Sequence, residues 1–176
     1  MKLVKGSFSS RETVEVAAVL RSLTSAAAQG EDGRFMRLAL YVAGGTLGDR
    51  GPKVGAVLAW RGTLLATAGC VRADGFHAEA AAILQARGRT RGATLYTTLE
   101  PCNGDDCSLA CAERIWRAGI ERVVIGCQDP SPYARGSTEY LRARGVHVST
   151  GPWRARAEAL VADRRLSFEL RRASAS

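Results

Sequence analysis

The sequence contains no run of about 20 apolar residues, the length that a membrane-spanning helix requires. Its first apolar stretch, residues 14–20, is interrupted by Glu15 and followed by Arg21, unlike the apolar region of a secretory signal. We therefore expect a chain that neither enters a membrane nor is exported, and we predict a cytoplasmic location.

Lysine is scarce, so the net charge of +8 is carried almost entirely by arginine. The arginines are scattered, and the densest run, 164–172, includes Glu169. Aromatic residues make up only 6% of the chain, which leaves few to alternate with arginines in a surface for single-stranded nucleic acid. The composition favours a small-molecule partner and keeps nucleic acid as the less favoured alternative.

Internal repeats and long linkers are also missing from the 176 residues, a length that fits one domain. The composition, 46% hydrophobic and 24% charged, is typical of a globular protein. We predict a helical N-terminal extension at 1–30, a domain at 31–170 and a frayed tail at 171–176.

The middle of the chain alternates between strand and helix patterns. Two predicted strands, 54–60 and 63–70, are joined by a hairpin turn at Arg61 and Gly62. The pattern predicts one sheet, mostly parallel, between two layers of helices. Further strands are expected at 93–99, 123–127 and 146–149, and helices at 11–29, from Asp32 to the glycines at 44–45, and at 77–87, 109–118, 137–144 and 153–170.

Five cysteines form an odd set, and in a reducing compartment clustered cysteines are typical of metal or catalytic sites. Cys102 follows a predicted strand, whereas His77 and Cys111 stand near the starts of predicted helices. One imidazole and two thiolates are three suitable ligands for a catalytic zinc ion, which keeps a fourth position for water. These three residues are therefore the candidate Zn²⁺ ligands.

Glu79 lies two positions after His77, in the first turn of the same predicted helix. Its carboxyl group can reach a water at the metal without binding the metal, and can move protons between that water and a substrate. The order H-x-E, then P-C, then a further cysteine is the signature of zinc nucleobase deaminases. The sequence thus predicts a hydrolase that acts on C–N bonds of cyclic amidines, with Glu79 as its catalytic residue.

Other assignments of the cysteines stay open. Cys107 lies four residues before Cys111, and its binding would close the site with a fourth ligand, as in a structural zinc site. Such a site would have no use for Glu79. Cys70 and Cys127 fall on predicted strands and are expected to be thiols of the core.

Seven short motifs together are typical of one family: PKVGAV at 52–57, HAE at 77–79, ATLYTTLEPC at 93–102, CA at 111–112, AGI at 118–120, RVV at 122–124 and QDPSP at 128–132. On these motifs the chain, from about residue 32 to 170, resembles the deaminase domain of the bifunctional riboflavin-biosynthesis deaminase–reductase, within the cytidine deaminase-like superfamily. The spacing of Cys102 and Cys111 is similar to that of this group and selects Cys111 over Cys107.

The resemblance implies an α/β fold, a three-layer α/β/α sandwich with a five-stranded mixed sheet, and zinc at the strand ends. It also implies removal of an exocyclic amine from a pyrimidine-type ring, and a homodimer or higher homo-oligomer. The implied substrate-binding residues are Gly51, Lys53, Phe76, Leu99, Glu100, Pro101, Asn103 and Asp129.

The sequence departs from this group around the expected substrate site. Gly51 stands where the group usually has asparagine, and Cys70 where it has histidine. The segment between the zinc cysteines lacks the group's histidine and arginine and carries Asp105 and Asp106, which would repel a phosphorylated substrate. We therefore expect a stand-alone relative that acts on a different amino-heterocycle, as in a specialised biosynthetic pathway, in salvage or in detoxification.

Two other functions remain as hypotheses. A tRNA or single-stranded DNA deaminase would hold phosphates on its arginines and take a flipped base into the pocket. A non-catalytic zinc-bearing interaction subunit would keep the fold and the metal, but it would not need Glu79.

Overall fold

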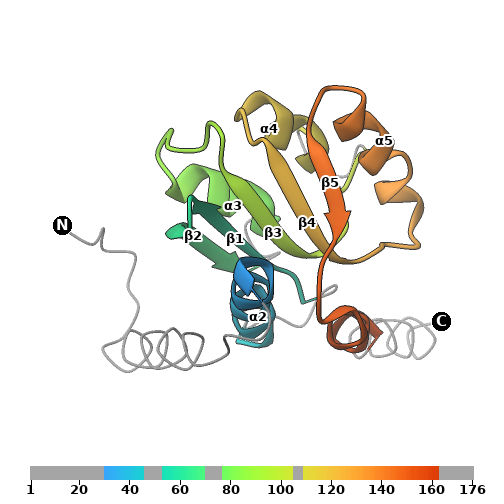
Figure 1. Ribbon diagram of the computed structural model, residues 1–176. Coiled ribbons are helices and arrows are strands. Elements are labelled where there is room, and N and C mark those ends of the chain that lie inside the picture. The colour runs from blue at the N-terminus through green and yellow to red at the C-terminus, as the bar shows by residue number, and fades with distance from the viewer. Residues whose placement is uncertain (1–29, 46–52, 70–76, 105–108, 163–176) are drawn as a thin grey trace.

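The computed structural model describes residues 30–45, 53–69, 77–104 and 109–162. Several predicted features lie outside the described residues: the helix at 11–29, the extension at 1–30 except its last residue, the end of the last predicted helix and the tail at 171–176. Five strands form one sheet in the order β2-β1-β3-β4-β5 (Figure 1). Their bounds are Gly55–Trp60 for β1, Thr63–Gly69 for β2, Thr94–Leu99 for β3, Arg122–Cys127 for β4 and His147–Thr150 for β5.

The strand directions differ in part from the prediction. β1 pairs antiparallel with both β2 and β3, whereas β3–β4 and β4–β5 are parallel. Two of the four strand pairings are therefore antiparallel and two are parallel, so the sheet is mixed rather than mostly parallel. The predicted hairpin explains the first antiparallel pair, but the second joins strands distant in sequence, which no turn motif announces. The carboxyl ends of β3 and β4 consequently meet at one edge of the sheet.

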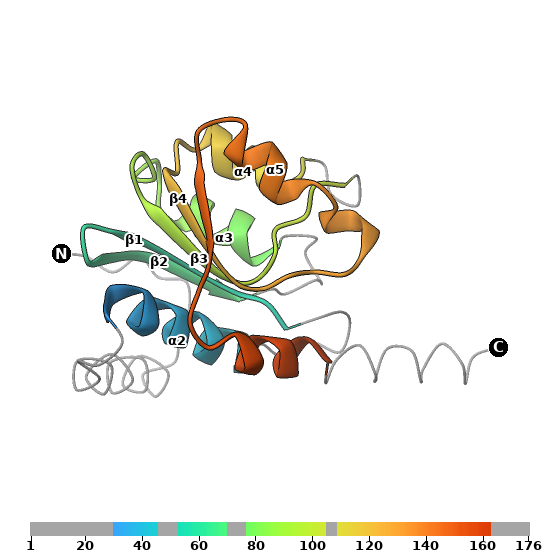
Figure 2. The same ribbon diagram turned by 45° about the vertical axis from the view of Figure 1, so that its right-hand side comes forward.

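Helices cover both faces of the sheet and give the expected three layers (Figure 2). α2 (Gly30–Gly44) and a helix at 154–162 lie on one face. α3 (Ala78–Gln85), α4 (Cys111–Arg117) and α5 (Ser137–Arg142) lie on the other, and a 3₁₀ turn, η3, spans Pro132–Ala134. No helix in these described segments is both long and apolar enough to span a membrane.

Close packing of α2 against β1 depends on Gly55. A Cβ atom at this position would lie 2.0 Å from the Ala39 carbonyl oxygen of α2, far inside van der Waals contact. The Gly55 amide donates a 3.0 Å hydrogen bond to the hydroxyl of Thr98 on β3. The missing side chain thus lets a helix and two strands meet within the core.

β3 occupies the centre of the sheet, and its side chains alternate between the two helix layers. Tyr96 faces α2, where its ring packs 5.2 Å from that of Phe35 and its hydroxyl donates a 3.0 Å hydrogen bond to Asp32. Asp32 also receives two hydrogen bonds, of 2.7 and 2.6 Å, from Arg122 at the start of β4. One carboxylate therefore ties α2 to two neighbouring strands.

We expect Asp32→Ala to lower the free energy of unfolding by about 1–3 kcal/mol, because the buried Tyr96 hydroxyl would lose its acceptor. The ion pair is partly exposed and adds at most about 1 kcal/mol. Hydrogen bonding from Arg122 lowers the pKa of Asp32 below its usual 3.8. The carboxylate's contribution is therefore fully present above pH 3.8 and is lost as the pH falls through the lowered value.

Urea denaturation of wild type and Asp32→Ala at pH 7 and pH 3 measures this difference. Glu113→Ala, which removes an exposed ion pair within α4, is the matched control, and its effect should stay within about 0.5 kcal/mol. An Asp32 variant as stable as the control at pH 7 would contradict the assignment.

Candidate metal centre and active site

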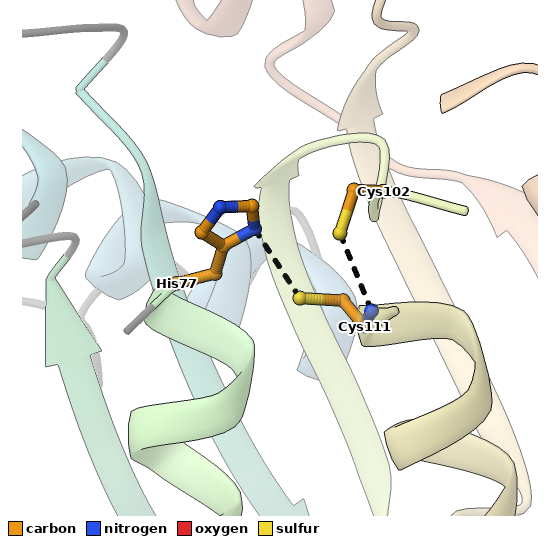
Figure 3. Close-up of side chains that lie close together, drawn as sticks. All are labelled: His77, Cys102 and Cys111. Carbon is orange, nitrogen blue, oxygen red and sulfur yellow. Dashed lines mark hydrogen bonds between the residues drawn. The ribbon is translucent and has the colours of Figure 1, made fainter. Parts of the chain in front are cut away.

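Three separate elements bring the predicted metal ligands together at the carboxyl edge of β3. His77 is the N-cap residue of α3, Cys102 follows the end of β3, and Cys111 is the first residue of α4. The side chains point toward one another (Figure 3), and their ligand atoms all lie within 4.8 Å of one another. Both cysteines are buried, and His77 is partly exposed.

Short contacts fix the two thiols on their elements. The Cys111 amide donates a 3.3 Å hydrogen bond to Cys102 Sγ, and the next amide, of Ala112, donates to the Cys102 carbonyl oxygen at 3.1 Å. Hydrogen bonds from Cys111 and from His77 hold the pKa of the Cys102 thiol well below its usual value, against the effect of burial. Cys102 therefore favours the thiolate, which is the form that binds metal.

The donor set fits zinc. His77 Nδ1 and Cys111 Sγ lie 3.4 Å apart. Zn–N and Zn–S bonds at a tetrahedral angle would separate such atoms by about 3.5 Å. Among the described residues, the group that could hold a metal consists of His77, Cys102 and Cys111. A four-coordinate zinc ion bound by these three ligands would keep one position for a water or a substrate.

Glu79 lies beside this cluster, in the first turn of α3, with only 3% of its surface exposed. Burial raises the pKa of its carboxyl group, and the positive charge of His77 opposes that rise. The Thr97 hydroxyl of β3 lies 3.0 Å from Glu79 Oε1. A buried carboxyl group whose affinity for a proton is increased is well placed to accept one and return it.

Residues after β3 that are expected to bind substrate also hold neighbouring segments together. Glu100 Oε1 accepts hydrogen bonds from Ser137 (2.8 Å) and Thr138 (3.0 Å) at the start of α5. Its other oxygen accepts one from the Asp129 amide at 3.3 Å. These bonds join the end of β3 to the segment after β4, so the Glu100 carboxylate positions the loop.

Asn103 joins the same two segments. Its backbone amide donates a 2.6 Å hydrogen bond to the Tyr133 carbonyl oxygen, and its side-chain amide donates a 3.2 Å bond to that of Arg135. Asp129 Oδ1 accepts a 2.9 Å bond from the Ser131 amide. The loop after Cys102 is thus fastened to the loop that contains η3.

The structure describes only some of the remaining residues that the sequence analysis singled out. Leu99 and Pro101 are buried on either side of Glu100, and Lys53 is partly exposed just before β1. Gly51 and Phe76 lie outside the described residues, as do Cys70 and Cys107. Cys127 is buried, as expected of a core thiol, and its Sγ donates to the Thr98 carbonyl oxygen at 3.3 Å.

A cavity of about 560 Å³ lies between the loop after β4 and the helix at 154–162. Glu100, Asp129 and Arg135 contribute to its wall, together with Arg154 and Glu158 of that helix. None of the three metal-ligand candidates lines it. The cavity and the metal cluster are therefore separate features of the carboxyl edge.

This arrangement agrees with a known family. The family described as the cytidine and deoxycytidylate deaminase zinc-binding region matches residues 29–127, a segment that includes the three candidate ligands and Glu79. The chain therefore belongs to this deaminase family.

The chain is also similar to proteins named riboflavin biosynthesis protein RibD and to a named pyrimidine deaminase. The chain is 39% identical to the RibD protein of Aquifex aeolicus over 123 residues, which are 68% of this chain and 35% of the relative. It is 36% identical to the diaminohydroxyphosphoribosylamino-pyrimidine deaminase of Buchnera aphidicola over 101 residues, 57% of this chain and 69% of that protein. The chain spans about a third of the length of the RibD proteins that it matches.

A solved structure supports the same relationship. The diaminohydroxyphosphoribosylaminopyrimidine deaminase/5-amino-6-(5-phosphoribosylamino)uracil reductase of Thermotoga maritima aligns with a TM-score of 0.69 and 36% identity. The alignment covers 74% of this chain and 39% of that one. The cytidine deaminase-like fold inferred from the motifs is therefore confirmed.

Motif reasoning did not single out Thr97, Ser137 or Thr138, although each contacts a predicted site residue. A signal for Thr97 was present, because a hydroxyl buried in the central strand of a sheet needs a hydrogen-bond partner. Ser137 and Thr138 gave no comparable signal, since small hydroxyl residues at a helix start are common.

Proposed function

We propose that the chain catalyses zinc-dependent hydrolytic deamination of a small amino-heterocycle of the pyrimidine type. The observation that carries this proposal is the joint geometry of one imidazole, two thiols and a buried carboxyl group: His77, Cys102 and Cys111 within 4.8 Å, with Glu79 beside them. A structural zinc site would explain the first three groups and leave Glu79, a buried acid, without a role.

His77, Cys102 and Cys111 would hold the ion, which when bound supplies Lewis acidity that lowers the pKa of a coordinated water toward about 7. Glu79 takes a proton from the attacking water and delivers it to the ring nitrogen beside the reacting carbon. The water oxygen bonds to that carbon. As the C–N bond breaks, Glu79 transfers the second water proton to the leaving amine, and ammonia and the oxo-heterocycle are released.

The substrate is proposed to differ from the phosphoribosyl compound in the names of the relatives. Asp105 and Asp106 stand between Cys102 and Cys111 and would oppose a phosphate dianion near the metal. No lysine and no arginine occurs in this segment of the sequence. We therefore favour a neutral or cationic substituent on the heterocycle.

Ammonia release tests the proposal. Zinc-loaded protein is incubated with aminopyrimidines, nucleosides, nucleotides and short single-stranded oligonucleotides, with Glu79→Ala as the blank. Release from one class of small, unphosphorylated heterocycles that vanishes in the blank is the expected result. Release only from oligonucleotides would replace the proposal by a polynucleotide deaminase, and silence across the whole panel would favour a non-catalytic subunit.

The homo-oligomer implied by the resemblance remains a prediction. Sedimentation velocity at several protein concentrations measures it directly. A species of monomer mass at all concentrations would contradict it.

A further inference from the structure

The two adjacent threonines of β3 have separate surroundings. The Thr98 hydroxyl faces the α2 side, where it accepts a hydrogen bond from the Gly55 amide. Thr97 faces the opposite side and is fully buried against α3. The alternation of a strand thus aims one hydroxyl into the structural core and its neighbour at the candidate catalytic carboxyl group.

The Thr97 hydroxyl meets two acceptors. Its Oγ1 lies 3.0 Å from Glu79 Oε1 and 3.0 Å from the Leu99 carbonyl oxygen. A hydroxyl has one hydrogen to donate and lone pairs with which to accept. The contact with Glu79 therefore joins α3 to the central strand of the sheet.

We propose that Thr97 is a positioning residue for deamination, whose hydroxyl fixes one carboxyl oxygen of Glu79 and thereby directs the group toward the reacting water. The inference rests on the proposed function. Thr97 itself touches neither the metal-ligand candidates nor, by this assignment, the substrate. Its contribution is the orientation of the residue that moves the protons.

The contact leaves the second carboxyl oxygen of Glu79 for the reaction. Oε1 accepts the hydrogen of the Thr97 hydroxyl, so Oε2 is the oxygen that faces the water and exchanges protons with it. Oε1 can accept this hydrogen bond whether or not Oε2 holds a proton. The same bond can therefore keep the orientation of the carboxyl group throughout the cycle.

Kinetics of three variants test this role, with the most active compound of the ammonia-release panel as substrate. Thr97→Val removes the hydroxyl and keeps the shape, and should lower kcat by roughly 10- to 100-fold with KM within about twofold. Thr97→Ser keeps the hydroxyl and should restore most of kcat. Thr98→Val removes a buried hydroxyl from the other face of the same strand and should leave kcat within about twofold of wild type.

A second readout does not depend on turnover. The infrared band of the Glu79 carboxyl group, identified by subtracting the spectrum of Glu79→Gln, should shift in Thr97→Val, return in Thr97→Ser and stay in place in Thr98→Val. An unshifted band, undiminished kcat in Thr97→Val, or no recovery in Thr97→Ser would overturn the proposal. A wild-type protein that releases no ammonia from any compound would overturn the proposed function itself, and the positioning role with it.

Discussion

Replacement of Glu79 by glutamine is expected to lower kcat for ammonia release by about 10²- to 10⁴-fold, the usual contribution of general acid–base catalysis. Glutamine keeps the size of the side chain and can still accept the hydrogen bond from Thr97, so the change isolates proton transfer from positioning. Zinc content, measured by atomic absorption, should stay at the wild-type ratio. Activity within tenfold of wild type would remove Glu79 from the mechanism.

The same variant should make the metal-free protein more stable at neutral pH. Burial raises the folded-state pKa of Glu79 above its usual 4.5, so the folded state binds this proton more tightly than the unfolded state. The Glu79 carboxyl group therefore destabilises the folded state least below pH 4.5, where it is protonated in both states. Its destabilising effect grows as the pH rises through the folded-state pKa. Thermal unfolding of apo wild type and Glu79→Gln at pH 4 and pH 7.5 should show the difference only at the higher pH.

Loss of zinc is the second large effect, and it is expected for Cys111→Ser. A serine hydroxyl is not a thiolate, and two ligands hold zinc far more weakly than three. The variant should lose zinc on dialysis and with it nearly all ammonia release. Cys107→Ser is the matched control, four positions earlier in the chain, and should keep both zinc and activity.

The control also decides between two ligand sets. Zinc lost from Cys107→Ser and kept by Cys111→Ser would mean that the ligand assignment is wrong. Zinc lost from both variants would indicate four ligands and a closed, structural site. The contact between Cys111 Sγ and His77 Nδ1, at 3.4 Å, supports the assignment of Cys111.

The sequence predicts those parts of the fold and site that local patterns determine. The bounds expected for the strands agree with β1, β3, β4 and β5 to within one residue, because apolar runs and turn residues delimit them. Metal chemistry restricts the residue types of a zinc site and so indicated His77 and the clustered cysteines, whereas the family resemblance selected Cys111 over Cys107. The structure brings His77, Cys102 and Cys111 together, and their binding of zinc stays a prediction. Helix ends were less accurate, and α4 begins at Cys111, two residues after the predicted start.

Other features depend on contacts between distant segments. β2 and α3 lie between β1 and β3 in the sequence, so no local pattern in either strand predicts their antiparallel pairing. Substrate binding by Glu100 stays a prediction, and nothing in the sequence indicates that its carboxylate accepts hydrogen bonds from Ser137 and Thr138, 37 and 38 residues away. A motif identifies a residue of interest, whereas only the packed structure shows which way its side chain is used.

Two hydrogen bonds connect Cys102 directly to the start of α4 and make its position independent of the sequence between them. They close the chain across the segment 103–110, so both thiols are held by the strand, the helix and each other. Insertions, deletions or charge reversals in that segment need not disturb the metal ligands, since loops tolerate changes in length at little cost. Exchange of this segment between relatives is thus a route by which one hydrolytic centre acquires new substrates during evolution or in the laboratory.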